Sequence, residues 1–365
     1  MIALNQLGQF KNGLNFSADS VSSVGCDIIG IPNFENNYIV PNNGLKKVDP
    51  SIVTDEFLLA DDDILFVRSN GNKALVGRTM IVKDLQKPTT FSGFCIRFRP
   101  NVDKVNPLYM LYLFKSPVFR RFFSSNQQTS ITNLNQDVLG KILIDLPALT
   151  EQNTIARAIH CLTQRIENNN EINDNLQQEL CLIYEHIMSQ AKKGLILGTH
   201  AIASELSEIT TGREDANFAD TNGKYKFFTC SSETLKCNHY AFNSSSILIA
   251  GNGEFNVKHF SGKFNAYQRT YVLTPKQEYY GLLYLACLYQ IKSFKSSSAG
   301  SIVKFITKGD IDDIPVFIPD DGTYLIQMNK LLDLQEMRLR ENEKLLALRD
   351  FLLPLLMNGQ ATIAE

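Results

Sequence analysis

The sequence predicts a mixed α/β (α+β) protein that has two globular domains, each followed by a long helix. Three observations lead to this prediction. Similar segments recur about 175 residues apart, two long helical segments carry an apolar seam, and two matching segments are strongly basic. The seams indicate that the two helices pair as an antiparallel coiled coil. We therefore divide the chain into domains at 1–149 and 194–319, spacer helices at 150–193 and 320–357, and a tail at 358–365.

In the first domain, β-forming residues predict strands at 64–66, 76–82 and 94–98. An Asn-Gly pair at Asn70 predicts a tight turn after the first of these strands, because asparagine and glycine tolerate positive φ angles. A segment at 107–123 has helical periodicity.

The second domain repeats this outline. Strands are expected at 246–250 and 268–273, with an Asn-Gly turn at Asn252 between them and a largely buried helix at 280–291. Both domains close on a strand-like segment that ends in proline, at Pro147 and at Pro319. The recurrence of the same order predicts two similar heads.

The first spacer helix carries an apolar seam with alternating spacings of four and three residues. Eight of its ten seam positions are aliphatic, which is typical of a coiled coil. These positions are Ile155, Ile159, Leu162, Ile166, Asn169, Asn173, Leu176, Leu180, Ile183 and Ile187. The second seam is weaker and runs through Met328, Leu332, Gln335, Leu339, Asn342, Leu346, Arg349 and Leu353.

An asparagine lies in the middle of each seam, at Asn169 and Asn342. A buried asparagine costs stability but fixes the register of a coiled coil, so we expect the two helices to pair with each other. Proline cannot continue a helix, and we expect the second helix to stop or kink at Pro354. The alternative is that each helix packs separately on its own domain.

Composition is that of a globular protein, with 44% hydrophobic and 20% charged residues. The net charge is −2, yet residues 64–123 hold eleven bases against two acids, and residues 255–308 hold eight bases against one acid. A segregated charge of this kind can present a cationic face to a polyanion. The alternative is a set of solvated lysines around each domain.

Motifs for covalent chemistry are missing from the sequence. Asn106-Pro107-Leu108-Tyr109 differs by one residue from an amino-methyltransferase motif, but no glycine-rich cofactor loop precedes it. The five histidines lack metal-ligand spacing, and the seven cysteines form no CxxC pair. We expect a reduced, metal-free chain without a signal peptide or membrane span, and no catalytic residues.

Three stretches resemble the specificity (S) subunit of type I restriction–modification systems. Pro147-Ala148-Leu149-Thr150-Glu151-Gln152, continuing to Asn169, resembles the start of that family's first central helix. Residues 348–359 resemble the end of its second helix, and residues 63–78 resemble part of its target-recognition domains. One departure is at the start of the second helix. The segment at 320–324 stands there in place of the Thr-Glu-Gln sequence that begins the first helix at Thr150.

The resemblance implies that each head is a target-recognition domain that reads one half of a bipartite double-stranded DNA site. It implies that the helices set the gap between the halves and that two modification subunits methylate adenine with S-adenosylmethionine. Restriction subunits, up to two where the system has them, would hold ATP and Mg. The chain itself would be a non-catalytic cytoplasmic subunit, bacterial or archaeal, that holds none of these cofactors.

The candidate DNA-binding residues are mainly basic and amide side chains beside the predicted turns. Arg or Lys suits guanine and Asn suits adenine in the major groove. The candidates are Arg68, Asn70, Asn72, Lys73 and Arg78 in the first head, and Asn252, Lys258, His259, Lys263, Tyr267 and Arg269 in the second. Each could instead be a turn former or a solvated charge.

Two other function classes remain open at this point. One is a stand-alone DNA-binding protein without enzyme partners, which co-purification would distinguish from a scaffold. The other is a methyltransferase with its own cofactor site, which predicts that the isolated chain binds S-adenosylmethionine.

Overall fold

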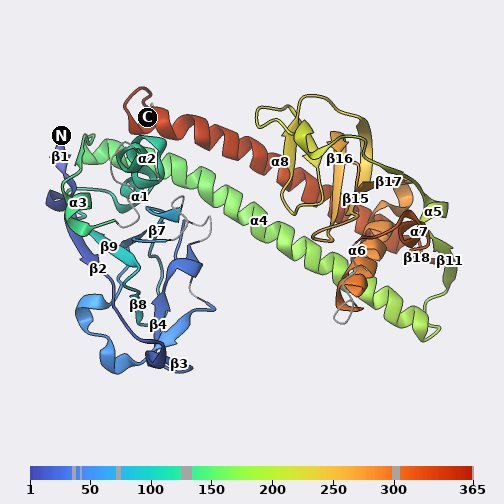
Figure 1. Cartoon of the computed structure of the whole chain (residues 1–365), viewed down its shortest axis with the longest axis horizontal. Coiled ribbons are helices and arrows are strands. Elements are labelled where there is room, and N and C mark those ends of the chain that lie inside the picture. The colour runs from blue at the N-terminus through green and yellow to red at the C-terminus, as the bar shows by residue number, and fades with distance from the viewer. Residues whose placement is uncertain (35–37, 42, 71–74, 125–133, 298–304, 364–365) are drawn as a thin grey trace. The chain divides into compact units, whose positions relative to one another are not determined.

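A computed structural model describes residues 1–34, 38–41, 43–70, 75–124, 134–297 and 305–363. The chain forms two compact units (Figure 1). The first unit comprises residues 1–166 and 344–365, and the second comprises residues 167–343. The division falls inside both long helices, so each unit contains one part of each.

The strands of the first unit form small sheets. Within the described residues, one sheet has the order β2-β9-β6-β7 and another has the order β3-β5-β4-β8, while β1 pairs with β10. Their bounds are β1 Ile2–Ala3, β2 Gly8–Asn12, β3 Val21–Ser22, β4 Cys26–Ile29, β5 Lys46–Val48, β6 Ile64–Val67, β7 Thr79–Ile81, β8 Thr89–Phe91, β9 Cys95–Pro100 and β10 Leu143–Ile144.

Helices α1 (Pro107–Lys115), α2 (Pro117–Ser124) and α3 (Gln136–Gly140) belong to the first unit. The single helix predicted at 107–123 is therefore two helices. The break falls at Ser116, which is extended (ψ 150°), because the residue before a proline is pushed out of the helical region. The apolar side of α1 packs on Phe66 and Phe98, and the cluster also includes Ile155 and Ile159 of α4 (Leu149–Lys192).

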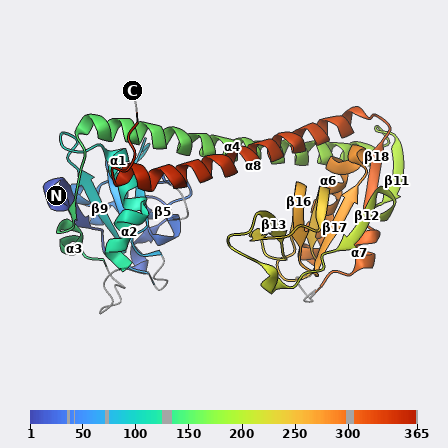
Figure 2. The same cartoon turned by 90° about the horizontal axis from the view of Figure 1, so that it is seen from above.

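In the second unit, the order of the main sheet is β12-β17-β15-β16-β13-β14, and β11 pairs with β18. Figure 2 shows α6 beside this sheet, and Ile247 and Leu273 pack on α6 in one apolar cluster. The bounds are β11 Gly198–Ile202, α5 Ala203–Leu206, β12 Ser207–Thr211, β13 Tyr225–Phe228, β14 Leu235–Cys237, β15 Phe242–Ala250, β16 Val257–Ala266, β17 Thr270–Pro275, α6 Tyr280–Ser297, α7 Lys308–Asp312, β18 Pro315–Pro319 and α8 Thr323–Met357.

The two units repeat the same backbone hydrogen bonds, which supports the duplication predicted from sequence. In the first unit they are Leu4 N to Ile142 O (3.1 Å), Gly13 N to Cys95 O (3.0 Å), Arg68 N to Phe94 O (2.7 Å) and Leu134 N to Arg68 O (2.8 Å). Their counterparts are Ala203 N to Ile314 O (3.0 Å), Gly212 N to Thr270 O (3.0 Å), Gly251 N to Arg269 O (2.9 Å) and Ile306 N to Gly251 O (2.8 Å).

This correspondence places individual strands. Ile64 of β6 pairs with Phe98 and Ile81, and Ile247 of β15 pairs with Leu273 and His259, so His259 occupies the place of Ile81. One long strand, β16, pairs with both β15 and β13, whereas β7 and β8 make the matching contacts separately in the first unit.

The two long helices pair as an antiparallel coiled coil, as predicted. In the second unit Asn169 Nδ2 donates to Asn342 Oδ1 at 2.8 Å, and Gln335 Nε2 donates to the Asn173 carbonyl at 3.0 Å. As residue numbers rise from 169 to 173 on α4, the partner residues on α8 fall from 342 to 335, so the helices are antiparallel. The alternative, in which each helix packs separately on its own domain, is wrong.

Most of the proposed seam positions are covered. Ile155, Ile159, Ile166, Asn169, Leu180, Ile187, Leu332 and Asn342 are buried, and Leu162, Leu176, Ile183 and Leu346 are partly buried. Leu339, however, is 40% exposed, so its assignment to the seam is corrected. The apolar cluster of the second unit reaches Leu332 on α8 but does not include Leu339, so this turn lacks the covering that a domain provides.

Of the two outcomes expected at Pro354, a stop or a kink, the stop does not occur, because α8 runs on to Met357 with Pro354 inside it. The end of the helix agrees with the predicted spacer at 320–357. Leu353, Leu356 and Met357 are buried in the cluster of the first unit. Burial of these side chains on both sides of the proline offsets the hydrogen bond that proline cannot donate.

Candidate nucleic-acid interface

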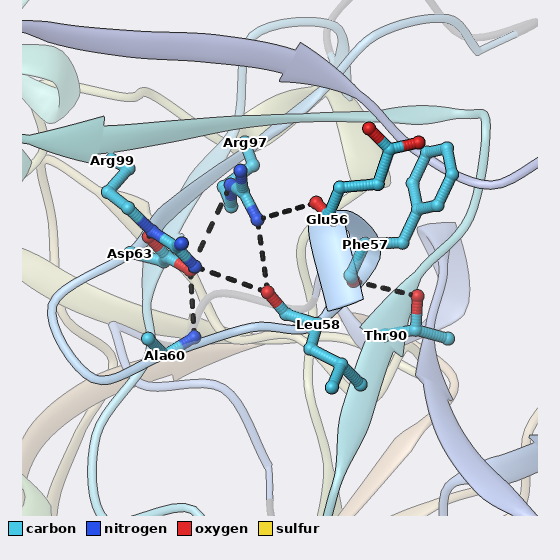
Figure 3. A network of polar contacts seen from close by, with 8 residues as sticks. All are labelled: Glu56, Phe57, Leu58, Ala60, Asp63, Thr90, Arg97 and Arg99. Atoms are coloured by element: carbon cyan, nitrogen blue, oxygen red, sulfur yellow. Dashed lines mark hydrogen bonds and ion pairs between the residues drawn. The ribbon is translucent and has the colours of Figure 1, made fainter. Parts of the chain in front are cut away.

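Part of the positive charge of the first unit is used inside the fold (Figure 3). Asp63 is 1% exposed, and its carboxylate accepts two hydrogen bonds of 2.7 Å from Arg99 and one of 2.8 Å from the Ala60 N–H. Arg97, 4% exposed, lies 4.0 Å from the same carboxylate and donates to the carbonyls of Glu56 and Leu58. These two arginines hold the loop at 55–63 against β9.

The count of eleven bases against two acids therefore overstates the cationic face. Asp62 pairs with Lys83, and Asp63 pairs with Arg97 and Arg99, although both acids precede the counted segment in sequence. Charges that are separate along the chain are neighbours in the fold.

Two candidates of the first head have internal hydrogen bonds. The Arg68 guanidinium donates to the Gly93 carbonyl at 3.2 Å, and the Arg78 guanidinium donates to the Phe34 carbonyl at 3.3 Å. Both side chains are partly buried. These contacts hold neighbouring loops in place, which leaves each guanidinium fewer donors for a base.

The turn after β6 differs from its predicted counterpart. Since Arg68 matches Gly251, Ser69 matches Asn252 and Asn70 matches Gly253, so the two Asn-Gly pairs are one residue out of step. Asn70 is partly buried, and Asn72 and Lys73 lie outside the described residues. In the second unit Gly253 has φ +70°, as a turn between β15 and β16 requires.

Four candidates of the second head lie on segments that meet. The Arg269 carbonyl accepts from the N–H of Gly251, beside Asn252, and Tyr267 N donates to the Phe228 carbonyl at 2.9 Å. The Lys258 ammonium donates to the Ser231 carbonyl at 2.7 Å, and burial lowers the pKa of this lysine. Asn252, Tyr267 and Arg269 thus belong to one group of loops, and Lys258 is tied to the loop at 229–233.

Lys263 lies elsewhere on the second unit. Its ammonium is 4.7 Å from the centre of the Tyr240 ring, and Tyr240 packs on Tyr225 with ring centres 5.0 Å apart. Lys263 and Tyr240 are exposed. An exposed cation over aromatic rings is a surface that suits a nucleic acid, but it is separate from the loops around Arg269.

His259 is misassigned as a DNA contact. Its ring packs edge-on against Tyr284, with ring centres 4.9 Å apart, and its Nδ1 is buried. Burial lowers the pKa of His259 to about 4. The neighbouring Lys258 points to the opposite face, because successive side chains of a strand alternate.

Replacing His259 by isoleucine, the residue at the matching position of the first unit, should reduce acid sensitivity. The folded pKa of about 4 lies below the usual 6.5, so this histidine favours folding above pH 6.5 and loses that contribution as the pH falls towards 4. Between pH 7.5 and 5 the difference is about 2 kcal/mol. Urea unfolding of both proteins at the two pH values measures it, and equal losses in both would contradict the prediction.

No cluster of three or more His, Cys, Asp or Glu side chains that could hold a metal ion occurs among the described residues. In the same part of the chain, none of the helices combines the length and apolar character needed to cross a membrane.

The family model described as "Type I restriction modification DNA specificity domain" matches residues 1–178 and 203–330, which is most of the sequence. The chain belongs to this family. The duplicated fold agrees with a match in two parts, because each part covers all or most of one domain and the N-terminal part of the helix that follows it.

Two curated relatives carry related names. The specificity subunit of the type I restriction enzyme EcoDI from Escherichia coli is 39% identical over 165 residues, which are 43% of this chain and 37% of that protein. The specificity subunit of StySPI from Salmonella potsdam is 25% identical over 170 residues, 46% of this chain and 36% of that protein. Each match thus spans little more than a third of the relative.

The fold also matches a solved structure over nearly its whole length. The S subunit of a type I restriction–modification system from M. genitalium superposes with a TM-score of 0.64 and 16% identity, and the match covers 97% of this chain and 95% of that one. At this identity the likeness concerns the fold.

Proposed function

We propose that the chain is a non-catalytic DNA sequence-recognition subunit that binds a bipartite site in double-stranded DNA. The observation that carries the proposal is the duplicated domain, whose two copies share hydrogen bonds but differ in exposed residues, combined with two helices that pair with each other. A protein with two similar readers of different surface chemistry suits a site with two different halves. Phosphate contacts would supply affinity and base contacts specificity.

The same proposal includes two modification subunits that methylate adenine, and restriction subunits where the system has them. S-adenosylmethionine would be held by the modification subunits, and ATP and Mg by the restriction subunits. The names of the EcoDI and StySPI relatives, both specificity subunits of type I restriction enzymes, support this assignment. The complex would act in the cytoplasm in defence against foreign DNA.

A second apolar stripe on α8 supports docking of a partner. Ile326, Leu334 and Met337 in the second unit, and Leu348 and Phe351 in the first, are 42–65% exposed. Within the second unit Ile326, Lys330, Leu334 and Met337 lie at spacings of four and three residues along the helix. Such a stripe suits a partner helix, and exposed apolar residues in a row commonly mark an interface.

A stand-alone DNA-binding protein is the alternative, and co-expression distinguishes the two. The chain is expressed with the modification subunits encoded beside it, the complex is purified, and methylated adenines in the host genome are mapped. Stable co-purification and a two-part methylation motif are expected. A chain that purifies alone and leaves the genome unmethylated would favour the alternative.

A further inference from the structure

Four loop segments of the second unit are joined into one surface. Gly251 N donates to the Arg269 carbonyl at 2.9 Å, and Ile306 N donates to the Gly251 carbonyl at 2.8 Å. The segment at 212–214 is tied to the same loops, since Gln268 N donates to the Glu214 carbonyl at 2.9 Å. This surface, called the second tip below, comprises residues 212–214, 251–252, 267–269 and 305–306.

Arg213 lies at the second tip, and its position is fixed from both sides. Gly212 N donates to the Thr270 carbonyl at 3.0 Å on one side, and the Glu214 carbonyl accepts from Gln268 on the other. A β-carbon on Gly212 would lie 2.1 Å from the Ala266 carbonyl oxygen, so the two backbones approach as closely as only glycine allows. The backbone of Arg213 is therefore held rigidly against the 267–270 turn.

The guanidinium groups of the second tip are available to a ligand. Arg213 and Arg269 are both exposed, and neither side chain has a hydrogen bond or ion pair with any other residue that the structure describes. In the first unit, by contrast, the guanidinium groups of Arg68, Arg78 and Arg120 donate to backbone carbonyls. Arginines on a fixed backbone with free donors are prepared for binding.

The matching positions of the first unit carry apolar side chains. Gly13 corresponds to Gly212, so Leu14 takes the place of Arg213, and Phe94 takes the place of Arg269. Phe94 is 60% exposed. The conserved hydrogen bonds build the same scaffold twice, and the chemistry of the two tips differs at these two positions.

We propose that Arg213 and Arg269 read guanine bases in the half-site bound by the second unit. The proposal deepens the function proposed above and rests on it. Arginine donates two hydrogen bonds to O6 and N7 of guanine in the major groove, and no other base offers that pair of acceptors. In the first unit, Leu14 and Phe94 occupy the places of these two arginines.

The test uses the full chain in the complex that it forms with its modification subunits, and duplexes that carry the methylation motif. Within each half-site, one deoxyguanosine at a time is replaced by 7-deaza-2′-deoxyguanosine, which lacks the N7 acceptor. Dissociation constants are measured by fluorescence anisotropy at constant salt, because salt alone changes affinity strongly. The proteins are wild type, Arg213→Ala, Arg269→Ala and the control Lys276→Ala, an exposed lysine beyond the far end of β17.

We expect the replacement to weaken wild-type binding about 10-fold in one half-site. Arg213→Ala and Arg269→Ala should each weaken binding to the natural duplex by a similar factor and remove sensitivity to the guanine that each arginine contacts. Lys276→Ala should behave as wild type.

Three results would overturn the inference while leaving the proposed function intact. They are a motif without guanine in either half, full sensitivity to 7-deazaguanine in both arginine variants, and equal weakening of motif and non-motif duplexes. The last would assign the arginines to phosphates. Failure of the wild-type complex to prefer any sequence would instead remove the proposed function itself.

Discussion

Replacing Asp63 by alanine will destabilise the first unit by about 3–5 kcal/mol, the range found when one partner of a buried ion pair is removed. The substitution leaves Arg97, only 4% exposed, without its counter-charge and removes both hydrogen bonds to Arg99. Burial already lowers the pKa of Arg97, and the charge on Asp63 opposes that shift. Without Asp63 the cost of holding a cation inside the fold is no longer offset.

Urea unfolding of the full-length chain measures this effect, and hydrogen exchange assigns it to β9 and the loop at 55–63. Asp63→Asn keeps the shape of the side chain and removes only its charge. It should therefore lower the free energy of unfolding, but by less than Asp63→Ala does. Glu56→Ala is the matched control. It removes a carboxylate of the same loop that pairs with Lys11 at the surface, and its attraction is the smallest of the effects on the pKa of Arg97. A midpoint for Asp63→Ala equal to that of Glu56→Ala would show that the buried pair contributes little.

Lengthening both spacer helices by one heptad will widen the gap in the methylated motif and leave its two halves unchanged. Insertions of seven residues after Ile166 in α4 and after Glu343 in α8 keep the seam in phase. Seven residues add about 10 Å to a helix at 1.5 Å each. This is the length of about three base pairs. A gap that widens by one to three base pairs is therefore expected.

Methylated adenines are mapped in hosts that carry the natural or the lengthened chain. Insertion in one helix alone is the control. It moves Asn169 out of register with Asn342, so the helices can no longer pair as before and methylation should be abolished. An unchanged gap in the doubly lengthened chain would remove the helices as the spacer.

The helix pairing could be predicted because its signal is local. Seam positions follow the 3.5-residue repeat, and Asn169 and Asn342 stood out as polar residues within apolar seams. The hydrogen bond of 2.8 Å between them joins residues that periodicity alone had selected. Leu339 fits the same repeat but is exposed, since periodicity does not tell where a domain covers the helix.

The candidate interface was harder to predict, because it depends on contacts between distant segments. Lys258 and His259 are neighbours on β16, so one must face inward, but the sequence does not say which. The charge count missed the pairing of Asp63 with Arg97 and Arg99 because the acid precedes the counted segment. Arg213 was missed for a similar reason, since it reaches the 267–270 turn only through the fold.

The break between α1 and α2 could have been predicted from sequence alone. Pro117 pushes the residue before it out of the helical region, and this signal was present in the segment predicted as a single helix at 107–123. Pro354 carries the same type of signal, yet α8 continues past it. Residues on both sides of each proline are buried, so neither the proline signal nor burial alone separates the two outcomes.

The most direct test of the central claim is methylome sequencing of a host that expresses this chain together with its modification subunits. The account predicts adenine methylation at a single motif of two specific halves separated by a gap of fixed length and unspecified sequence. A continuous motif, or halves separated by variable distances, would contradict two recognition domains held by a paired helical spacer.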